Sequence, residues 1–234
     1  MTSLSKSARV AGLLYVVASA VGIVRLLYVP KALFVHGNAA ATAGNIAGHE
    51  LLFRLGIVCY LLGGVLWLFV PLALYRLFKG VNQGLAVVMV ILGSLMQTPV
   101  FVINTMNDVA ALLFAGGADF MSVIDKVQRE AFMMLFLNLH YHLDLANEIF
   151  WGLWLVPFGL LVYRSRFLPR ILGVWLILAC FGWLALSLTS LLFPPYAEMV
   201  YKSTQPATLG EVATMLWLVI MGAKERPLQA TASA

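Results

Sequence analysis

The sequence predicts an all-α fold, an integral membrane bundle of six transmembrane helices with a further helix on the extracytoplasmic surface. The first observation is composition: of 234 residues, 62% are hydrophobic and 11% are charged, with a mean hydropathy of +0.93. Soluble domains carry about 25% charged residues. The second is a set of six apolar runs, each long enough or nearly so to cross about 30 Å of hydrocarbon. The third is the basic residues at the ends of these runs.

The chain reads as a single polytopic domain, residues 1–234. Lys6 and Arg9 precede the first run as they would in a signal peptide, but this run is too long for one and lacks a small-residue cleavage site, so we expect an uncleaved span. The third run is over-long, and Gln97 with Pro99 fits a hydrogen-bonded kink within it. The expected spans are approximately residues 8–29, 51–77, 84–113, 136–163, 171–193 and 206–222.

Two of the outer connections carry helix signals. Residues 119–135 place apolar side chains at helical spacing and charged ones elsewhere, which predicts an amphipathic helix on the membrane surface, capped by Asp119. A short helix is expected near residues 39–46, capped by Asn38.

Basic residues near the span ends set the expected orientation. With the N-terminus inside, nine of the fifteen Lys and Arg residues are cytoplasmic, whereas only Glu225 of the ten acidic residues is. Both termini are therefore expected in the cytoplasm, and the net charge of +5 reflects topology without any need for nucleic acid. The nine basic residues are Lys6, Arg9, Arg76, Lys79, Arg164, Arg166, Arg170, Lys224 and Arg226.

Ionisable residues inside membrane spans are costly and usually mark a site. In the fourth span His140, Asp144 and Glu148 follow one another at i, i+4 intervals and so share one helical face. Counting along each helix puts Arg25, Glu148 and Glu211 at one level, roughly 18 to 24 Å from the inner ends of their spans. The alternative is a structural ion pair of Arg25 with either of these glutamates.

Further polar residues are expected nearer the outer end. Asn104 with Asp108, and Glu50 with Arg54, are i, i+4 pairs on the third and second spans, and His49 precedes Glu50. Together with the residues of the fourth span they predict a polar chamber that opens outward. The Glu50 and Arg54 pair is also explained as an ordinary helix pair at the interface.

From this chamber we expect a membrane-embedded enzyme that acts on a lipid or isoprenoid-like apolar substrate taken from the bilayer. Carboxyl groups in apolar surroundings can serve as general acids or bases in cyclase-like or isomerase-like chemistry, and arginine can hold an anionic part of the substrate. The expected catalytic residues are Glu148, Asp144, His140, Glu50, Asp108 and Glu211, and the expected substrate-binding residues are Arg25, Arg54, His49, Asn104 and Trp151.

Metal-dependent hydrolysis is the alternative chemistry for the same chamber. His140 and Asp144 have the i, i+4 spacing that lets two side chains share a divalent metal, and His49 with Asp108 would complete the ligand set. Such a metal would generate a hydroxide for hydrolysis. The HExxH and HxxxH motifs are absent from the sequence, so a metal cofactor is the weaker expectation.

Two other classes of function remain open. A proton- or cation-coupled small transporter would use the acidic residues to bind its ion, but needs polar lining on both sides of the midplane, whereas the inner halves of these spans are almost purely apolar. A membrane accessory or scaffold subunit would bind a partner through the outer loops. Membrane lipids and an apolar small molecule are the expected partners, and glycine-rich helix faces permit a homo-oligomer.

Three stretches are similar to a known family. They are residues 39–46 (AAATAGNI), 49–57 (HELLFRLGI) and 163–173 (YRSRFLPRILG). They resemble the bacterial multi-pass membrane family numbered 4386 among the domains of unknown function, over residues 8–222.

This resemblance implies a protein of the bacterial plasma (inner) membrane with six or seven helices, and no particular activity. It places His49, Glu50 and Arg54 in a motif, with a histidine near His140. In size and membrane setting the chain is also similar to the ceramidase and progestin-receptor hydrolases, whose HxxxH spacing it lacks, and to small membrane terpene cyclases that use acidic residues.

Overall fold

The computed structural model describes residues 3–117 and 119–224, without the side chain of Asp119. Within these ranges all the regular elements are helices, which confirms the all-α class. Glu225 and Arg226, which the charge pattern places on the inner side, lie outside the described residues. Five helical runs are long and apolar enough to cross a membrane, namely Ser3–Leu33, Glu50–Phe78, Gln83–Gly116, Lys126–Ser165 and Arg170–Leu192.

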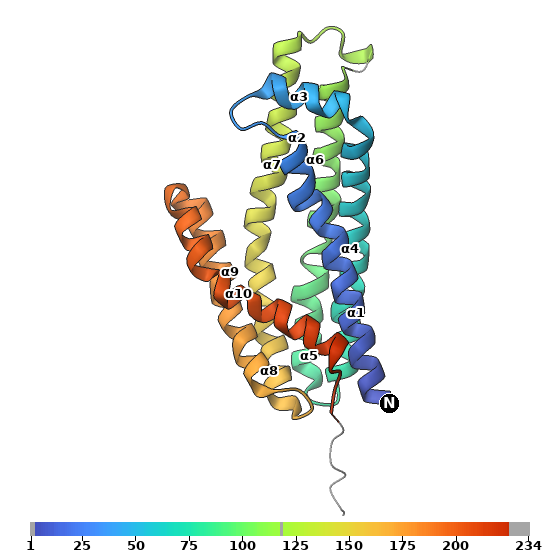
Figure 1. Cartoon of the computed structure of the whole chain (residues 1–234), viewed down its shortest axis with the longest axis vertical. Coiled ribbons are helices and arrows are strands. Elements are labelled where there is room, and N and C mark those ends of the chain that lie inside the picture. The colour runs from blue at the N-terminus through green and yellow to red at the C-terminus, as the bar shows by residue number, and fades with distance from the viewer. Residues whose placement is uncertain (1–2, 118, 225–234) are drawn as a thin grey trace, which may run out of the picture.

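The first two spans pack along the long axis of the molecule (Figure 1). The first consists of α1 (Ser3–Ile23) followed by a π-helical turn, η1 (Val24–Tyr28). It meets α4 (Glu50–Phe78) where the Cβ position of Gly63 is only 3.3 Å from the backbone of Gly22. Residues without side chains let two helix backbones approach this closely inside a membrane.

A short helix lies across the end of the bundle opposite the N-terminus (Figure 1). The first span ends in α2 (Val29–Leu33), and α3 (Ala39–Gly48) follows. The Asn38 side chain accepts a hydrogen bond of 2.9 Å from the backbone N–H of Ala41. The predicted short helix and its Asn38 cap are therefore confirmed.

The third run is helical but interrupted. It consists of α5 (Gln83–Val90), a second π-helical turn η2 (Ile91–Leu95), and α6 (Thr98–Gly116), which has Pro99 in its first turn. The side-chain amide of Gln97 donates to a carbonyl of η2 at 3.1 Å. The structure thus confirms that Gln97 satisfies a backbone acceptor where the run is interrupted before Pro99, and the kink itself stays a prediction.

The helix α7 (Lys126–Leu153) begins outside the bundle and runs into it without a break. The Asp125 side chain accepts a hydrogen bond of 2.9 Å from an N–H of the first turn and caps the helix. The separate surface helix expected over residues 119–135 is therefore not found: only Asp119–Met121 forms a 3-10 turn before α7. The physical reason is that α7 contains no proline, and no glycine before its last turn, that would end a helix there.

The last helices form an arm beside the other spans (Figure 1). After α8 (Leu155–Ser165), α9 (Arg170–Leu192) leads through a 3-10 turn, η4 (Pro194–Tyr196), into α10 (Ala197–Ile220). The first half of α10 packs on α9 and its second half crosses to α1. The sixth span expected over residues 206–222 lies mostly in this second half, and it is not among the helices apolar enough to span, because the first half of α10 is polar.

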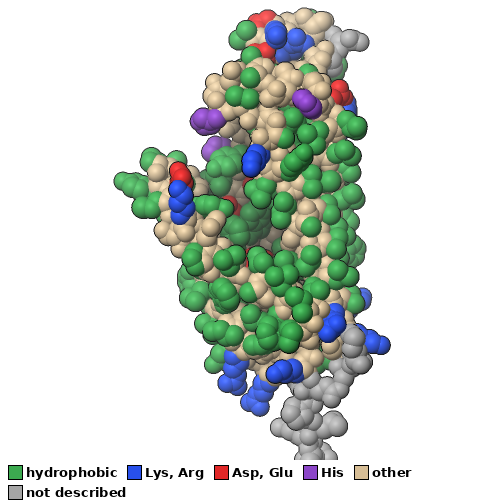
Figure 2. All heavy atoms as spheres, in the orientation of Figure 1, with side chains coloured by type: hydrophobic (Ala, Val, Ile, Leu, Met, Phe, Trp, Pro, Cys, Tyr) green, Lys and Arg blue, Asp and Glu red, His purple; other side chains and the backbone are tan. Residues whose placement is uncertain are grey.

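Both described ends of the chain lie at the same end of the bundle. Gly222 packs against Ser5 and Arg9, and the backbone N–H of Lys224 donates to the Phe167 carbonyl at 3.0 Å. Figure 2 shows Lys and Arg side chains gathered at this end of the molecule. This arrangement agrees with the expected placement of basic residues at the inner span ends, and the orientation itself stays a prediction.

Aromatic side chains fill the half of the bundle near the N-terminus. The fully buried Trp154 ring lies 5.8 Å from Tyr15, 5.6 Å from Trp67 and 5.3 Å from Phe158, measured between ring centroids. Phe78 continues the cluster at 5.9 Å from Phe158. This half therefore has a packed apolar core.

Candidate functional site

The polar site is built around an ion pair inside the other half of the bundle. Arg25 in η1 donates from Nε and Nη2 to the two carboxylate oxygens of Asp108 in α6, at 2.7 and 2.6 Å. Their side chains are only 3% and 0% exposed. The Phe34 and Phe53 rings lie 5.5 and 5.9 Å from the guanidinium carbon. The bidentate ion pair and the two flanking rings together offset the free energy that it costs to remove the arginine charge from water.

His140 of α7 connects this pair to a second carboxylate. Its Nδ1 lies 3.0 Å from Oδ1 of Asp108, and its Nε2 lies 3.2 Å from Oδ2 of Asp144. Both ring nitrogens thus lie within ion-pair distance of a carboxylate, although neither meets hydrogen-bond geometry. With Arg25 included, the four groups carry no net charge when the imidazole is doubly protonated, and one negative charge when it is neutral.

Two uncharged side chains close the arrangement. The Tyr60 hydroxyl donates to Oδ1 of Asp144 at 2.8 Å. The Asn104 amide nitrogen lies 2.8 Å from the same oxygen and 3.2 Å from the His140 carbonyl oxygen. Three of the four carboxylate oxygens of the two aspartates thus accept a hydrogen bond, and the fourth, Oδ2 of Asp144, lies 3.2 Å from His140 Nε2. We refer to the set as the polar network, composed of Arg25, Tyr60, Asn104, Asp108, His140 and Asp144.

Glu148 lies one turn of α7 beyond Asp144 and differs from the polar network. It is only 8% exposed, and its Oε2 has no hydrogen-bond partner among the described residues. Oδ1 of the neighbouring Asn147, which is 3% exposed, also has no hydrogen-bond partner among the described residues. Figure 2 shows the surface hollowed between the α9–α10 arm and the rest of the bundle, with acidic side chains visible inside the hollow. Glu148 is thus a buried carboxyl group with one oxygen that can still accept or donate a hydrogen bond.

Glu211 is held separately, at the crossing of α10 and α1. It is half-buried and accepts a hydrogen bond from the Tyr15 hydroxyl. The Trp183 indole of α9 approaches the same carboxyl group and also packs on Trp151 of α7, with ring centroids 5.4 Å apart. This places Trp151, an expected substrate-binding residue, beside the arm instead of in the polar network.

The predicted common level of Arg25, Glu148 and Glu211 is wrong. Arg25 pairs with Asp108, whereas Glu211 pairs with Tyr15, which precedes Arg25 by ten residues, or about 15 Å of helix. Two effects make the residue count fail. The Arg25 guanidinium lies against Phe34, nine residues further along the chain. In addition, α10 crosses the bundle obliquely (Figure 1).

The candidates at the start of α4 lie at the surface. Arg54 and Glu50 pair at 2.6 Å, with side chains 58% and 49% exposed, which confirms the ordinary helix pair. His49 is exposed, and its Nδ1 lies 3.1 Å from the Asn45 carbonyl oxygen. These three residues do not join Asp108, Asn104 or the fourth-span residues, so they are not part of the polar network.

The four candidate metal ligands do not form one set. His49 is exposed, whereas the two nitrogens of the buried His140 lie 3.0 and 3.2 Å from Asp108 and Asp144. Among residues 3–117 and 119–224, no group of three or more His, Cys, Asp or Glu side chains is arranged to hold a metal ion. The donor arrangement thus gives the divalent-metal expectation no support.

The sequence reasoning did not include Tyr60. It lies in an apolar run of α4, yet it is only 2% exposed and its hydroxyl bonds to Asp144. Only a general argument could have identified it from the sequence. A buried tyrosine hydroxyl needs a hydrogen-bond partner, so a tyrosine in the middle of a span indicates polar groups on neighbouring helices.

Residues 10–222 match the model of a family described as Domain of unknown function (DUF4386). The match includes every helix that contributes to the polar network. It confirms the resemblance inferred from the three sequence stretches. No curated protein and no solved structure matches the chain.

Proposed function

The chain belongs to the DUF4386 family, whose description states no activity, and on the geometry of the site we propose a membrane-embedded enzyme that moves protons on an apolar, lipid-like or isoprenoid-like substrate. Glu148 is its general acid and base. The substrate enters from the side of the bundle, through the hollow between the α9–α10 arm and the other helices (Figure 2).

The observation that carries this proposal is the unpartnered carboxyl oxygen of Glu148. A buried polar atom without a hydrogen bond costs free energy, and native proteins keep few of them. The aspartates of the polar network are already engaged by Arg25, His140 and Tyr60. The network therefore acts as a rigid frame, and Glu148 is the group that remains available for a substrate.

The surroundings of Glu148 suit proton transfer to carbon. The protonated carboxyl group would donate its proton to one carbon of a substrate double bond, which leaves a positive charge on the other carbon. The resulting carboxylate would then remove a proton from the next carbon beyond that charge, which shifts the double bond and regenerates the acid. Trp151, three residues away on α7, packs with Trp183, and aromatic faces attract the positive charge that develops between the two steps.

Proton-coupled transport is the second candidate. The observation in its favour is the line of titratable side chains formed by Glu148, Asp144, His140 and Asp108, of which the last three are in contact. A carrier also needs a polar path through the other half of the membrane. That half is packed with Trp154, Phe158 and other aromatic residues, so the enzyme is the better supported candidate.

Deuterium incorporation tests the proposal on any substrate that a membrane lipid extract contains. Purified protein would be incubated in D2O with a total extract, and the lipids analysed by mass spectrometry. We expect the wild type to produce a lipid species that carries one deuterium in place of one hydrogen, and Glu148→Gln to reduce its rate by about 100-fold or more, the usual contribution of a general acid or base.

The matched control is Glu198→Gln, because Glu198 is an exposed carboxylate that already pairs with Lys202. Its labelling rate should equal that of the wild type. Equal labelling by Glu148→Gln and the wild type, or no labelled lipid in any sample, would overturn the proposed proton transfer.

A further inference from the structure

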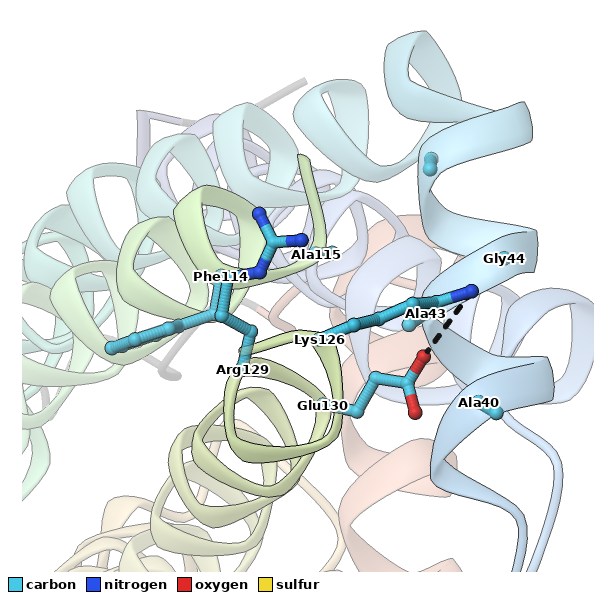
Figure 3. A pocket seen from close by; sticks show the side chains of 9 residues that line it. Ala40, Ala43, Gly44, Phe114, Ala115, Lys126, Arg129 and Glu130 are labelled. Carbon is cyan, nitrogen blue, oxygen red and sulfur yellow. Dashed lines mark ion pairs between the residues drawn. The ribbon is translucent and has the colours of Figure 1, made fainter. Parts of the chain in front are cut away.

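A second site lies at the end of the bundle opposite the N-terminus. There a pocket of about 190 Å³ separates α3 from the start of α7 and the end of α6 (Figure 3). The α3 wall consists of small residues, including Ala43 and Gly44, and Phe114 belongs to the α6 wall. The small residues create the space, because a Cβ atom built at Gly44 meets nothing within 4 Å.

Three charged residues at the start of α7 line this pocket: Lys126, Arg129 and Glu130. Lys126 Nζ lies 3.9 Å from Glu130 Oε1, as the dashed line in Figure 3 marks. Together the three side chains contribute one net positive charge to the pocket.

Arg129 is the unsatisfied member of this set. Its Nε is shielded from solvent and has no hydrogen-bond partner, and no described side chain forms an ion pair with it. The guanidinium lies against Gly117, which ends α6 with a φ of 63°. The carboxyl end of a helix supplies about half an elementary charge, which leaves the arginine without a full counter-charge.

Exposed apolar residues lie close in sequence to the charged residues of the pocket. Phe120, Val123 and Val127 are 70%, 90% and 74% exposed, around the start of α7. Side chains of this kind at the end of a membrane bundle are suited to the boundary between head groups and acyl chains. A ligand bound here thus meets both a cationic pocket and an apolar surface.

We infer that this pocket binds the phosphodiester head group of an anionic membrane lipid. The guanidinium of Arg129 matches the geometry of phosphate oxygens. A phosphodiester carries a single negative charge, which balances the single net positive charge of the pocket. The neighbouring Phe120, Val123 and Val127 contact the acyl chains, which distinguishes a lipid from free phosphate. This site is independent of Glu148 and of the proposed reaction.

Native mass spectrometry of the detergent-purified protein tests this inference. The protein would be titrated with a short-chain phosphatidylglycerol, and separately with inorganic phosphate. We expect saturable binding of one phosphatidylglycerol that Arg129→Gln weakens roughly ten- to hundredfold, the range for hydrogen bonds to charged groups. Gly44→Leu should also abolish binding, because it fills the pocket while leaving all three charges in place.

The matched control is Lys202→Gln, since Lys202 is 70% exposed and paired with Glu198 away from the pocket. It should bind as the wild type does. Wild-type affinity in both Arg129→Gln and Gly44→Leu, or no lipid bound by the wild type, would overturn the site. If inorganic phosphate bound as tightly as the lipid, the ligand would be a soluble phosphate and the lipid assignment would be wrong.

Discussion

Two arginine–carboxylate pairs in this protein have the same chemistry and the same shortest distance, 2.6 Å, in different surroundings. Arg25 and Asp108 are 3% and 0% exposed, whereas Arg54 and Glu50 are 58% and 49% exposed. An exposed helix pair contributes about 0.3–0.5 kcal/mol. Removing one partner of a buried pair costs about 3–5 kcal/mol, because the other charge is left uncompensated. The burial of each pair, and not its distance, therefore decides how much free energy of unfolding is lost when one partner is removed.

The two pairs also differ in what they connect. Arg54 and Glu50 are one turn apart on α4, so their interaction constrains a helix that is already formed. Arg25 and Asp108 are 83 residues apart, and Asp108 additionally contacts His140. The buried pair therefore fixes η1, α6 and α7 relative to one another, and it aligns the α7 face that continues to Glu148.

Asp108→Asn breaks the buried pair and should have the largest effect. The substitution leaves the Arg25 charge inside the bundle with a neutral amide, and the free energy of unfolding should fall by about 3–5 kcal/mol. Unfolding in mixed detergent micelles measures this change. The double variant Arg25→Gln, Asp108→Asn is the control: it removes both charges and should recover part of the loss. A single variant within about 1 kcal/mol of the wild type would contradict the assigned role of the pair.

Tyr60→Phe tests the uncharged part of the polar network and should have an intermediate effect. It removes the hydroxyl that donates to Asp144 but leaves the Asn104 amide on the same oxygen. Interhelical hydrogen bonds in membrane proteins contribute about 0.6 kcal/mol on average and at most about 1.7, so the loss should fall in this range. Tyr141→Phe is the matched control, because Tyr141 is 56% exposed on α7. Equal losses in the two variants would show that the Tyr60 hydroxyl has no special role.

The sequence predicted the features that depend on local pattern. Apolar runs indicated the five spans, and the hydrogen bonds of Asn38 and Gln97 were predicted correctly because their partners lie within a few residues. The i, i+4 spacing also placed His140 and Asp144 together, and they are in contact.

The predictions that failed concern features that depend on how the helices cross. Residue counting gives depth only for helices parallel to the membrane normal, and α10 is oblique, so Glu211 was assigned to the wrong level. The partner of Arg25 could not be chosen from a sequence with several buried acids, because the choice depends on which helix η1 faces. The start of α7 at Lys126 followed from the Asp125 cap, which amphipathic spacing alone did not reveal.

Arg54→Gln completes the comparison with the smallest expected effect. Because the pair is exposed and local, the loss in unfolding free energy should stay within about 0.5 kcal/mol. It should also shrink as salt is raised, since the Debye length falls from about 10 Å at 0.1 M to about 3 Å at 1 M ionic strength. The buried Arg25 and Asp108 pair is shielded from these ions, so the effect of Asp108→Asn should persist in the same titration. A loss above about 1 kcal/mol in Arg54→Gln, independent of salt, would show that this pair is desolvated as the buried one is, and that burial in the bundle is not what separates them.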